Sequence, residues 1–366
     1  MSKPMAFIGR EGTGMSVVIV TGSAGLIGSE AVRHFAGVGH DVIGVDNDMR
    51  SVFFGAGSST LATRAALERD LASYRHHDLD IRDREGVFAL FETVGRDLSA
   101  VIHTAAQPSH DWAARDPILD FEVNAVGTLN LLEATRRTDR SIPFVLTSTN
   151  KVYGDRPNTI ELVELPSRWE VPSDSPYAPG IDESMSIDES MHSVFGASKV
   201  AADIMVQEYG RYFGMPTVVF RGGTLTGSHH AAAELHGFLA YLFKCTRDGR
   251  PYSIFGYSGK QVRDVIHASD VVRAMDHFVS DPGPGYVFNL GGGRTSNCSV
   301  LEAIELCEDV TGRRLNHSYV AQARQGDHIW WISDNSRFEA RYPTWRQRYG
   351  LRDIVEEMAA APATQS

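Results

Sequence analysis

A glycine-rich turn near the start of the chain constrains the fold more than any other feature of the sequence. A run of apolar residues at 17–21 leads directly into the sequence GSAGLIG, in which Gly22, Gly25 and Gly28 recur at three-residue intervals. A helical pattern of apolar residues follows at 26–35. Glycine permits a tight turn and a close approach of the backbone to a pyrophosphate, and the start of the helix presents N–H donors to it. This order predicts a strand, a phosphate-binding turn and a helix.

Strands and helices continue to alternate through the first 220 residues. The next strand candidates are β-branched runs at 41–46, 100–104, 143–147 and 217–221, and helical patterns lie near 121–137 and 196–213. Continuous apolar strands that alternate with helices are typical of a parallel sheet covered on both faces. Right-handed crossovers make such a sheet doubly wound. We therefore predict an α/β fold of the Rossmann type.

Acidic residues after the second and third strands indicate which dinucleotide the turn binds. Asp46 ends the second strand, where a carboxylate accepts hydrogen bonds from the ribose hydroxyls and repels a 2′-phosphate. This favours NAD over NADP. Asp80 follows the third strand, where it either borders the adenine or belongs to an ordinary strand-to-helix turn. The residues predicted to bind NAD are Gly22, Gly25, Leu26, Ile27, Gly28, Asp46, Asn47, Asp80 and Ile81.

The same patterns divide the chain into a larger and a smaller part. Residues 1–15 are predicted to be an N-terminal extension, within which Met15 is a possible start site, and residues 16–221 the NAD-binding domain. A polar, proline-rich insertion at 157–191 is typical of a functional lid or a disordered loop. Glycine-rich turns and short segments after residue 221 predict a smaller C-terminal lobe over 222–366. We expect this lobe to bind substrate and to return some elements to the larger domain.

Composition argues against several other classes of protein. The 35 basic and 46 acidic residues give a formal net charge of −11, unlike the basic footprint of a nucleic-acid binder. Cys245, Cys298 and Cys307 show no CxxC spacing, so neither a disulfide framework nor a zinc site is indicated. The histidines form no HExxH motif, and no metal site is predicted. No apolar run reaches the ~18–20 residues of a membrane span. We expect a cytoplasmic protein with no nucleic-acid or membrane partner.

Eight short motifs extend from the glycine-rich turn into the last third of the chain. They are TGSAGLIGS (21–29), HDLDIRD (77–83), VIHTAAQ (101–107), NAVGTLNLLEA (124–134), STNKVYGD (148–155), FGASK (195–199), KQVRDVIH (260–267) and FNLGGG (288–293). Together they resemble the extended short-chain dehydrogenase/reductase family of nucleotide-sugar-modifying enzymes, from about residue 17 to the end of the chain. Within that family, STNKVYGD and GKQVRDVIH look most similar to the CDP-tyvelose (CDP-paratose) 2-epimerases.

One position departs from the resemblance. In the family, a Tyr-x-x-x-Lys pair does the proton chemistry, because the lysine and oxidised nicotinamide lower the pKa of the tyrosine. Lys199 matches the lysine, which also contacts the cofactor, but Phe195 stands at the tyrosine position. A phenyl ring cannot accept a proton. Three interpretations are open: an engineered Tyr→Phe variant, a natural enzyme with another base (Thr149, His192 or Lys199), or a protein that binds its ligands without turnover.

The resemblance also assigns roles to neighbouring residues. Thr149 matches the Ser/Thr that hydrogen-bonds the reacting hydroxyl, and Asn124 the helix asparagine that supports the active-site backbone. Asn150 and Lys151 stand where the similar 4,6-dehydratases carry Asp-Glu. An amide and an ammonium cannot perform that acid/base chemistry, which argues against a 4,6-dehydratase. With His192, they are expected to contact the substrate.

Two arginines complete the candidate substrate site. Arg263 and Arg324 match family arginines that bind the diphosphate, for which the guanidinium fork is suited. The resemblance implies NAD-dependent epimerisation of a CDP- or UDP-linked sugar through a transient keto intermediate, with C2 of a CDP-sugar preferred. The alternatives are C4 epimerisation of a UDP-hexose and a non-catalytic NAD- and nucleotide-sugar-binding protein. A homodimer is expected by analogy with the family.

Overall fold

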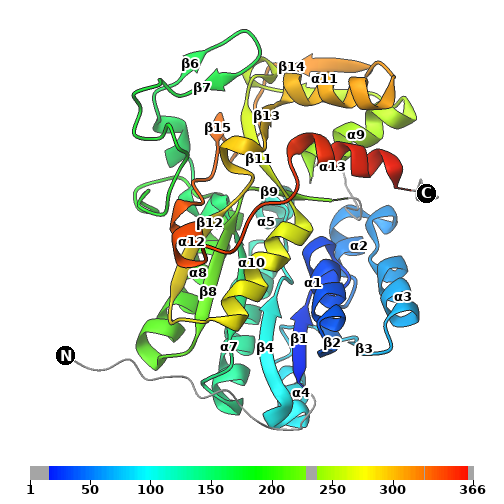
Figure 1. The fold of residues 1–366 in the computed structure, drawn as a ribbon, viewed down its shortest axis with the longest axis vertical. Coiled ribbons are helices and arrows are strands. Elements are labelled where there is room, and N and C mark those ends of the chain that lie inside the picture. Colours follow the sequence, from blue (N-terminus) through cyan, green and yellow to red (C-terminus); the bar gives the residue numbers. More distant parts are fainter. Residues whose placement is uncertain (1–15, 228–236, 325, 362–366) are drawn as a thin grey trace.

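A seven-stranded parallel sheet forms the centre of the larger domain (Figure 1). The computed structural model describes residues 16–227, 237–324 and 326–361, so the predicted extension at 1–15, with Met15, lies outside the described residues. The sheet order is β12-β8-β5-β4-β1-β2-β3, and every neighbouring pair is parallel. The strands are β1 (Val17–Thr21), β2 (Asp41–Val45), β3 (Tyr74–His77), β4 (Leu98–His103), β5 (Phe144–Thr149), β8 (Thr217–Gly222) and β12 (Tyr286–Leu290). Because the order reverses between β1 and β4, the predicted doubly wound α/β fold is confirmed.

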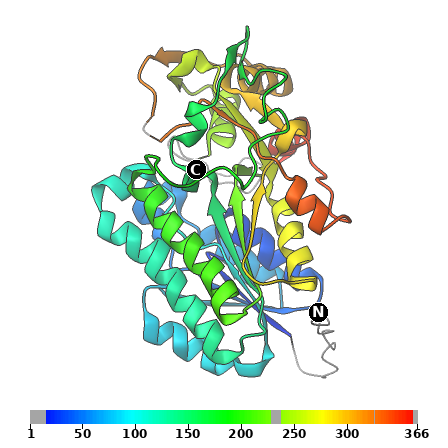
Figure 2. The ribbon, with the colours of Figure 1, turned by 90° about the vertical axis from the view of Figure 1, so that its left-hand side faces the viewer.

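Helices cover both faces of this sheet (Figure 2). Val18 and Val20 of β1 pack in the core beneath α1 (Leu26–Gly37) and α10 (Ala268–Ser280). Ile19, between them, points to the opposite face and packs with residues of α4 (Arg84–Val94), α7 (Gly127–Thr138) and α8 (Ser193–Phe213). Successive side chains of a strand point to opposite faces, so a fully apolar strand supplies both cores.

The connection from β2 to β3 is largely helical. It contains α2 (Met49–Phe54), a short 3₁₀ turn, η1 (Ala56–Ser58), and α3 (Leu61–Asp70). Leu67 of α3 is fully buried in the same core as Val18. The connection therefore belongs to the packed domain and borders the carboxyl end of β2.

The smaller lobe is built around β11 (Val262–His267). This strand pairs with β9 (Thr224–Thr226), β13 (Asn297–Ser299) and β15 (Trp330–Trp331), while β10 (Tyr252–Phe255) pairs separately with β14 (His317–Val320). The lobe's helices α9 (Phe238–Asp248), α11 (Val300–Thr311) and α13 (Leu351–Ala360) bury Leu242, Ile304 and Ile354 in one apolar core.

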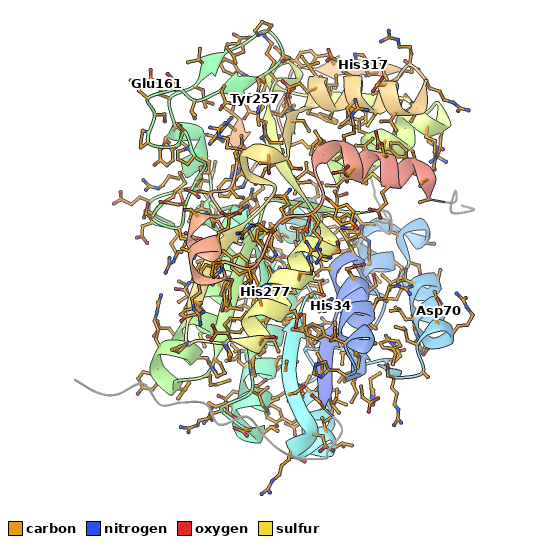
Figure 3. All side chains as sticks on the ribbon, viewed as in Figure 1. His34, Asp70, Glu161, Tyr257, His277 and His317 are labelled. Carbon is orange, nitrogen blue, oxygen red and sulfur yellow. The ribbon has the colours of Figure 1, made fainter. Side chains whose placement is uncertain are left out.

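Elements from the second part of the chain return to the larger domain. β12 pairs with β8 at the edge of the seven-stranded sheet. α10 packs beside α1, as the labelled His277 and His34 show (Figure 3). His34 Nε2 lies 3.0 Å from Asp276 Oδ2 of α10. Short α12 (Ser336–Arg341) also contributes Phe338 to the core beneath α1. The two parts of the chain are thus interleaved in space.

The insertion at 157–191 is packed against the smaller lobe. It begins within η5 (Arg156–Thr159) and includes the hairpin of β6 (Val163–Glu164) and β7 (Trp169–Glu170). Ile181 donates its backbone N–H to Ile332 O at 2.7 Å. Ile181 and Met185 are buried against Trp330 and Trp331. These apolar contacts anchor the segment to the smaller lobe.

None of the helices within the described ranges is long and apolar enough to cross a membrane. Cys245, Cys298 and Cys307 are buried, and no disulfide joins them in the described part of the chain.

Candidate functional site

A cavity of about 470 Å³ opens at the carboxyl ends of the sheet strands. Its walls come from segments that follow β1, β2, β3, β4, β5 and β8, and the smaller lobe adds Phe238, Arg263 and Asp327. Ligands of open α/β sheets bind at this edge, where the strand order reverses. The cavity is therefore the candidate active site.

The glycine-rich turn forms one end of the cavity. Gly22 has a φ of +66°, and a Cβ there would lie 2.7 Å from the backbone nitrogen of Ala105. Gly25 precedes the first residue of α1, and no side chain caps that helix. Gly22, Gly25, Leu26 and Ile27 all line the cavity. The start of α1 therefore faces the cavity with backbone groups alone.

Gly28 has a different place in this turn. It does not line the cavity. A Cβ at Gly28 would lie 2.0 Å from Gly22 O, closer than any real Cβ contact. The absence of a side chain lets α1 pack directly on the turn, which fixes the direction of the helix.

Asp46 lies beside the glycine turn at the end of β2. Its Oδ2 accepts a hydrogen bond from Ala24 N at 3.1 Å, and its Oδ1 accepts one from Asp48 N at 2.9 Å. The hydroxyl of Thr60 also donates to Oδ1, at 3.3 Å. These contacts hold a carboxylate in the cavity wall, where it can accept the hydroxyls of a ribose.

Asn47, Asp80 and Ile81 lie next along the wall. Asn47 Nδ2 donates to Asp80 Oδ2 at 3.2 Å, and Arg82 donates to the same carboxylate through its backbone and its guanidinium. Burial raises the pKa of Asp80, but these hydrogen bonds outweigh it and hold that pKa below its ordinary value. Asp80 is thus an ionised residue whose two oxygens both have partners within the protein.

The residues at this end of the cavity fit a dinucleotide. A Cβ at Gly22 would fill the turn, no side chain competes for the start of α1, and Asp46 stands where a ribose is expected.

Phe195 and Lys199 lie one helical turn apart on α8, and both line the cavity with buried side chains. Lys199 Nζ donates to Thr147 O at 3.2 Å. Burial lowers the pKa of Lys199 to about 8, although Asp203 and Asp120 oppose this shift. An uncharged phenyl ring and a readily deprotonated ammonium therefore occupy the two positions of the expected proton-transfer pair.

Thr149, Asn150 and Lys151 follow at the end of β5, where η4 (Asn150–Tyr153) begins. The Thr149 hydroxyl accepts from Lys151 N at 3.2 Å and lies 3.4 Å from Asn150 Oδ1. Lys151 Nζ donates to Gly326 O at 2.9 Å. Desolvation lowers the pKa of Lys151 to about 8, with Asp327 opposing and Arg263 reinforcing the shift.

Arg263 reaches the same region from β11. Its Nη2 forms an ion pair with Asp327, and its Nη1 donates to Val262 O at 2.7 Å. Burial raises the pKa of Asp327, but Arg263 and Lys151 outweigh it and keep that pKa below its ordinary value. Two cations and one carboxylate thus face the cavity from two lobes of the protein.

Asn124 lies behind the cavity, within a π-helical turn, η3 (Glu122–Val126), that joins α6 (Pro117–Phe121) to α7. Its Oδ1 accepts from Gln107 N at 2.9 Å, and its Nδ2 donates to Gln107 O at 3.1 Å and to Ser198 Oγ at 3.0 Å. Asn124 thereby ties the chain after β4 to α8.

Two other candidate residues lie outside the cavity lining. His192 precedes α8, with its Nε2 3.4 Å from Ser190 Oγ. The Arg324 guanidinium lies over the Phe255 ring, 4.4 Å from its centroid.

His110 also lines the cavity, although its sequence context alone indicates this only weakly. It opens α5 (His110–Arg115), in the segment that follows β4. Its ring packs edge-on against Phe195, with centroids 4.8 Å apart and an interplanar angle of 61°. The sequence indicates only that His110 is a polar residue in the segment after β4, a central strand whose carboxyl end borders the cavity. Its proximity to Phe195 depends on the tertiary fold.

No group of three or more His, Cys, Asp or Glu side chains in the described parts of the chain is arranged to hold a metal ion.

Comparisons with known proteins agree with this geometry. Residues 18–291 match the NAD dependent epimerase/dehydratase family. The chain is 30% identical over 353 residues to the CDP-paratose 2-epimerase of Salmonella typhi, covering 93% of this chain and 97% of that protein. It is 30% identical over 338 residues to the dTDP-glucose 4,6-dehydratase of Neisseria meningitidis, covering 90% and 85%. The UDP-glucose 4-epimerase of Thermus thermophilus, solved in complex with NAD, has a TM-score of 0.74 at 25% identity, covering 94% of this chain and 100% of that one.

Proposed function

Because the chain belongs to the NAD dependent epimerase/dehydratase family, we propose that it is an NAD-dependent epimerase of a nucleotide-diphosphate sugar. The reaction passes through a transient keto intermediate, and the preferred substrate is a CDP-linked sugar that reacts at C2. One observation carries the proposal: a single cavity joins a dinucleotide-type glycine turn to a cationic region that faces it from both lobes.

The first part of the proposal concerns the cofactor. NAD, when bound, supplies the hydride acceptor and donor. Gly22, Gly25, Leu26 and Ile27 bind its pyrophosphate through backbone groups, and Gly28 keeps the turn closed. Asp46 accepts the ribose hydroxyls. Asn47, Asp80 and Ile81 border the adenine, and Lys199 holds the nicotinamide end.

The second part concerns the substrate. Lys151 and Arg263 attract the diphosphate-linked sugar, and Arg263 offers a planar pair of donors. Thr149 hydrogen-bonds the reacting hydroxyl, Asn150 lies beside it, and Asn124 holds the surrounding backbone in place. Arg324, which stacks on Phe255, has to leave that ring or contact the diphosphate from its edge. His192 remains a candidate contact only for a part of the substrate outside the cavity.

Different observations support the choice of substrate and its alternatives. The likeness to the Salmonella typhi CDP-paratose 2-epimerase supports chemistry at C2 of a CDP-sugar. The structural likeness to the Thermus thermophilus UDP-glucose 4-epimerase keeps C4 epimerisation of a UDP-hexose as the alternative. Asn150 and Lys151 argue against 4,6-dehydration, because the acidic pair of that reaction is missing. Because Phe195 lacks a proton-accepting hydroxyl, the alternative from another class is a protein that binds NAD and a nucleotide sugar without catalysis.

The test is incubation of the protein and NAD with CDP- and UDP-hexoses that carry deuterium at C2 or C4, followed by NMR of the sugar. The expected result is inversion at C2 of a CDP-sugar with the deuterium retained, because the hydride leaves and returns through NAD. Inversion at C4 of a UDP-sugar establishes the alternative reaction. Binding of CDP and UDP by calorimetry without conversion of any sugar establishes the non-catalytic alternative, and a 4-keto-6-deoxy product overturns epimerisation.

We also propose that the protein is a homodimer. Ile118, Phe121 and Val126 on α6 and η3, and Ile204 and Tyr212 on α8, are exposed although apolar or aromatic. α6 and η3 pack directly against α8, so these side chains lie on neighbouring helices. A second copy of the chain is the occupant that suits such a face, because two-fold interfaces are self-complementary. The predicted cytoplasmic location stays a prediction.

A further inference from the structure

Phe195 removes a proton-accepting hydroxyl from the cavity, and the imidazole that touches Phe195 can supply another acceptor. The two rings meet edge-on, with centroids 4.8 Å apart. Both residues line the cavity, together with Lys199 and Thr149. His110 thus lies against the ring that stands at the tyrosine position, and it faces the same cavity.

The surroundings of His110 fix the direction of its ring. Its Nδ1 lies 3.1 Å from Ser193 Oγ, which also accepts a hydrogen bond from Gly196 N at 3.3 Å. Gly326 closes on the other side, where a Cβ would lie 2.9 Å from His110 Cε1. In the part of the chain that the structure describes, Nδ1 makes the hydrogen bond between the His110 ring and a protein side chain, and the residue lines the cavity. One ring nitrogen is therefore held by the protein, and the other is left for a ligand.

The charges that face His110 keep its imidazole neutral. Desolvation lowers the pKa of His110 to about 4, and Lys151 adds to this shift while Asp327 opposes it. The buried His328 also faces His110, and its own pKa is held well below the ordinary value. A neutral imidazole has a free lone pair, which a proton acceptor requires.

The other candidate bases are less well placed. Lys199 Nζ is engaged with Thr147 O, and the Thr149 hydroxyl already accepts from Lys151 N. His192 lies outside the cavity lining and pairs with Ser190.

We propose that His110 is the acid–base residue of the epimerisation and takes over the role of the absent tyrosine hydroxyl. This inference rests on the function proposed above. In the oxidation, the sugar O–H bond breaks, its proton bonds to His110 Nε2, and its electron pair completes the carbonyl as the hydride passes to NAD. In the reduction, the hydride returns to the carbonyl carbon and the Nε2 proton returns to the oxygen. Ser193 Oγ accepts the Nδ1 proton throughout.

The first test observes His110 directly and needs no turnover. The histidine side chains are labelled with ¹³C and ¹⁵N, and the His110 signals are assigned by their loss in His110→Gln. We expect a neutral ring at pH 7 with the proton on Nδ1, and a rise in the His110 pKa by at least about one unit when CDP and NAD are added, since an anion stabilises the imidazolium. A neutral ring protonated at Nε2, or a His110 pKa that CDP and NAD leave unchanged, overturns the proposal.

The second test compares variants with a matched control. His110→Gln is expected to lower kcat by about 10²–10⁴-fold, with NAD and CDP affinities within about threefold of the parent protein. His317→Gln, an exposed histidine on β14, is the control and leaves kcat unchanged (Figure 3). The double variant His110→Gln/Phe195→Tyr is expected to recover at least tenfold of the loss, because it restores a phenol beside Lys199. A merely structural role for His110 predicts that His110→Gln lowers kcat by the same factor with and without Phe195→Tyr.

The outcomes separate the two proposals. Turnover that survives His110→Gln within threefold overturns the role of His110 and leaves the proposed function intact. If the parent protein converts no sugar, the proposed function fails, and the labelled-histidine experiment still decides whether His110 is a poised proton acceptor. Circular dichroism and thermal melts of His110→Gln and His110→Asn ensure that a loss of kcat is measured on folded protein.

Discussion

Arg221 and Asp203 form a buried ion pair that joins β8 to α8. Arg221 Nε lies 2.9 Å from Asp203 Oδ2, and Nη2 lies 3.0 Å from Oδ1. Arg221 Nη1 also donates to the Tyr153 hydroxyl at 3.0 Å, and that hydroxyl donates to Asn289 Oδ1 at 2.8 Å. This network of hydrogen bonds joins η4, α8, β8 and β12. It therefore connects α8, which also carries Lys199, to two strands of the sheet.

Arg221→Met is expected to lower the free energy of unfolding by about 3–5 kcal/mol, because it leaves Asp203 as an unpaired buried carboxylate. Urea denaturation measures this loss. The matched control is Arg211→Met, which breaks the exposed pair with Glu208 on the same helix and is expected to cost less than about 1 kcal/mol. An equal loss of unfolding free energy in the two variants would show that the buried pair stabilises the fold no more than an exposed pair does.

Gly28→Ala is expected to disrupt the NAD site, because the added methyl meets Gly22 O at 2.0 Å. We expect NAD affinity to fall by more than about tenfold, equivalent to about 1.4 kcal/mol, and the melting temperature to fall as well. Gly37→Ala, at the other end of α1, is the control, since nothing lies within 4 Å of its added methyl. Calorimetric titration with NAD and thermal melts of both variants provide the comparison. Unchanged NAD binding by Gly28→Ala would remove the turn from the proposed cofactor site.

Asp46→Asn is expected to weaken the discrimination between NAD and NADP. The carboxylate repels a 2′-phosphate and accepts the ribose hydroxyls, and an amide loses the repulsion. We expect the ratio of the NADP and NAD dissociation constants to fall by about tenfold, equivalent to about 1.4 kcal/mol. Asp41→Asn makes the same change of charge at the opposite end of β2 and should leave the ratio unaltered. A constant ratio in both variants would show that Asp46 does not face the ribose.

CDP affinity is expected to fall as the pH rises through about 8. The pKa of Lys151 is lowered to about 8, so the side chain is charged below this pH and loses its charge above it. The fall reaches at most about tenfold per pH unit for one proton. Lys151→Arg keeps its charge throughout and should remove this component, while any component from Lys199 remains in both proteins. Identical pH profiles for the two proteins would exclude Lys151 from the anion site.

Ile118→Glu and Phe121→Glu are expected to convert a dimer to monomers, because a charge replaces an exposed apolar side chain on the proposed interface. Sedimentation equilibrium gives the mass directly. Val38→Glu, an equally simple change at an exposed valine next to α1, should leave the mass unaltered. A parent protein that sediments as a monomer would refute the proposed dimer.

The sequence predicts the elements around the glycine turn closely. The predicted strand at 17–21 coincides with β1, and the helix predicted at 26–35 extends only two residues further, to Gly37. Local sequence suffices to predict these two elements, because the spacing of apolar residues and the glycines act between residues that are close in the chain. Local sequence patterns do not predict that β12 pairs with β8. The two strands are separated in the chain by the whole first half of the smaller lobe.

The strand pattern alone indicates Asp46, which follows β2, whereas Lys199 and Arg263 are indicated by the family motifs. All three line the cavity. The sequence does not identify His110 as a site residue, because its candidate role depends on contact with Phe195. A separate helix, α8, brings Phe195 against it. Arg324 and His192 were expected at the site by motif position, but a neighbouring ring and a neighbouring hydroxyl engage their side chains outside the cavity lining.

The position of β12 at the edge of the sheet has a consequence for synthesis of the chain on the ribosome. Until residues 286–290 have emerged, β8 is an edge strand whose outer N–H and C=O groups lack a ladder partner, and unpaired edges invite intermolecular pairing. A fragment that stops at residue 221 exposes this edge permanently. The nascent protein therefore completes its cofactor-binding sheet only after the first half of the smaller lobe has been translated, and the two parts are expected to mature as one cooperative unit.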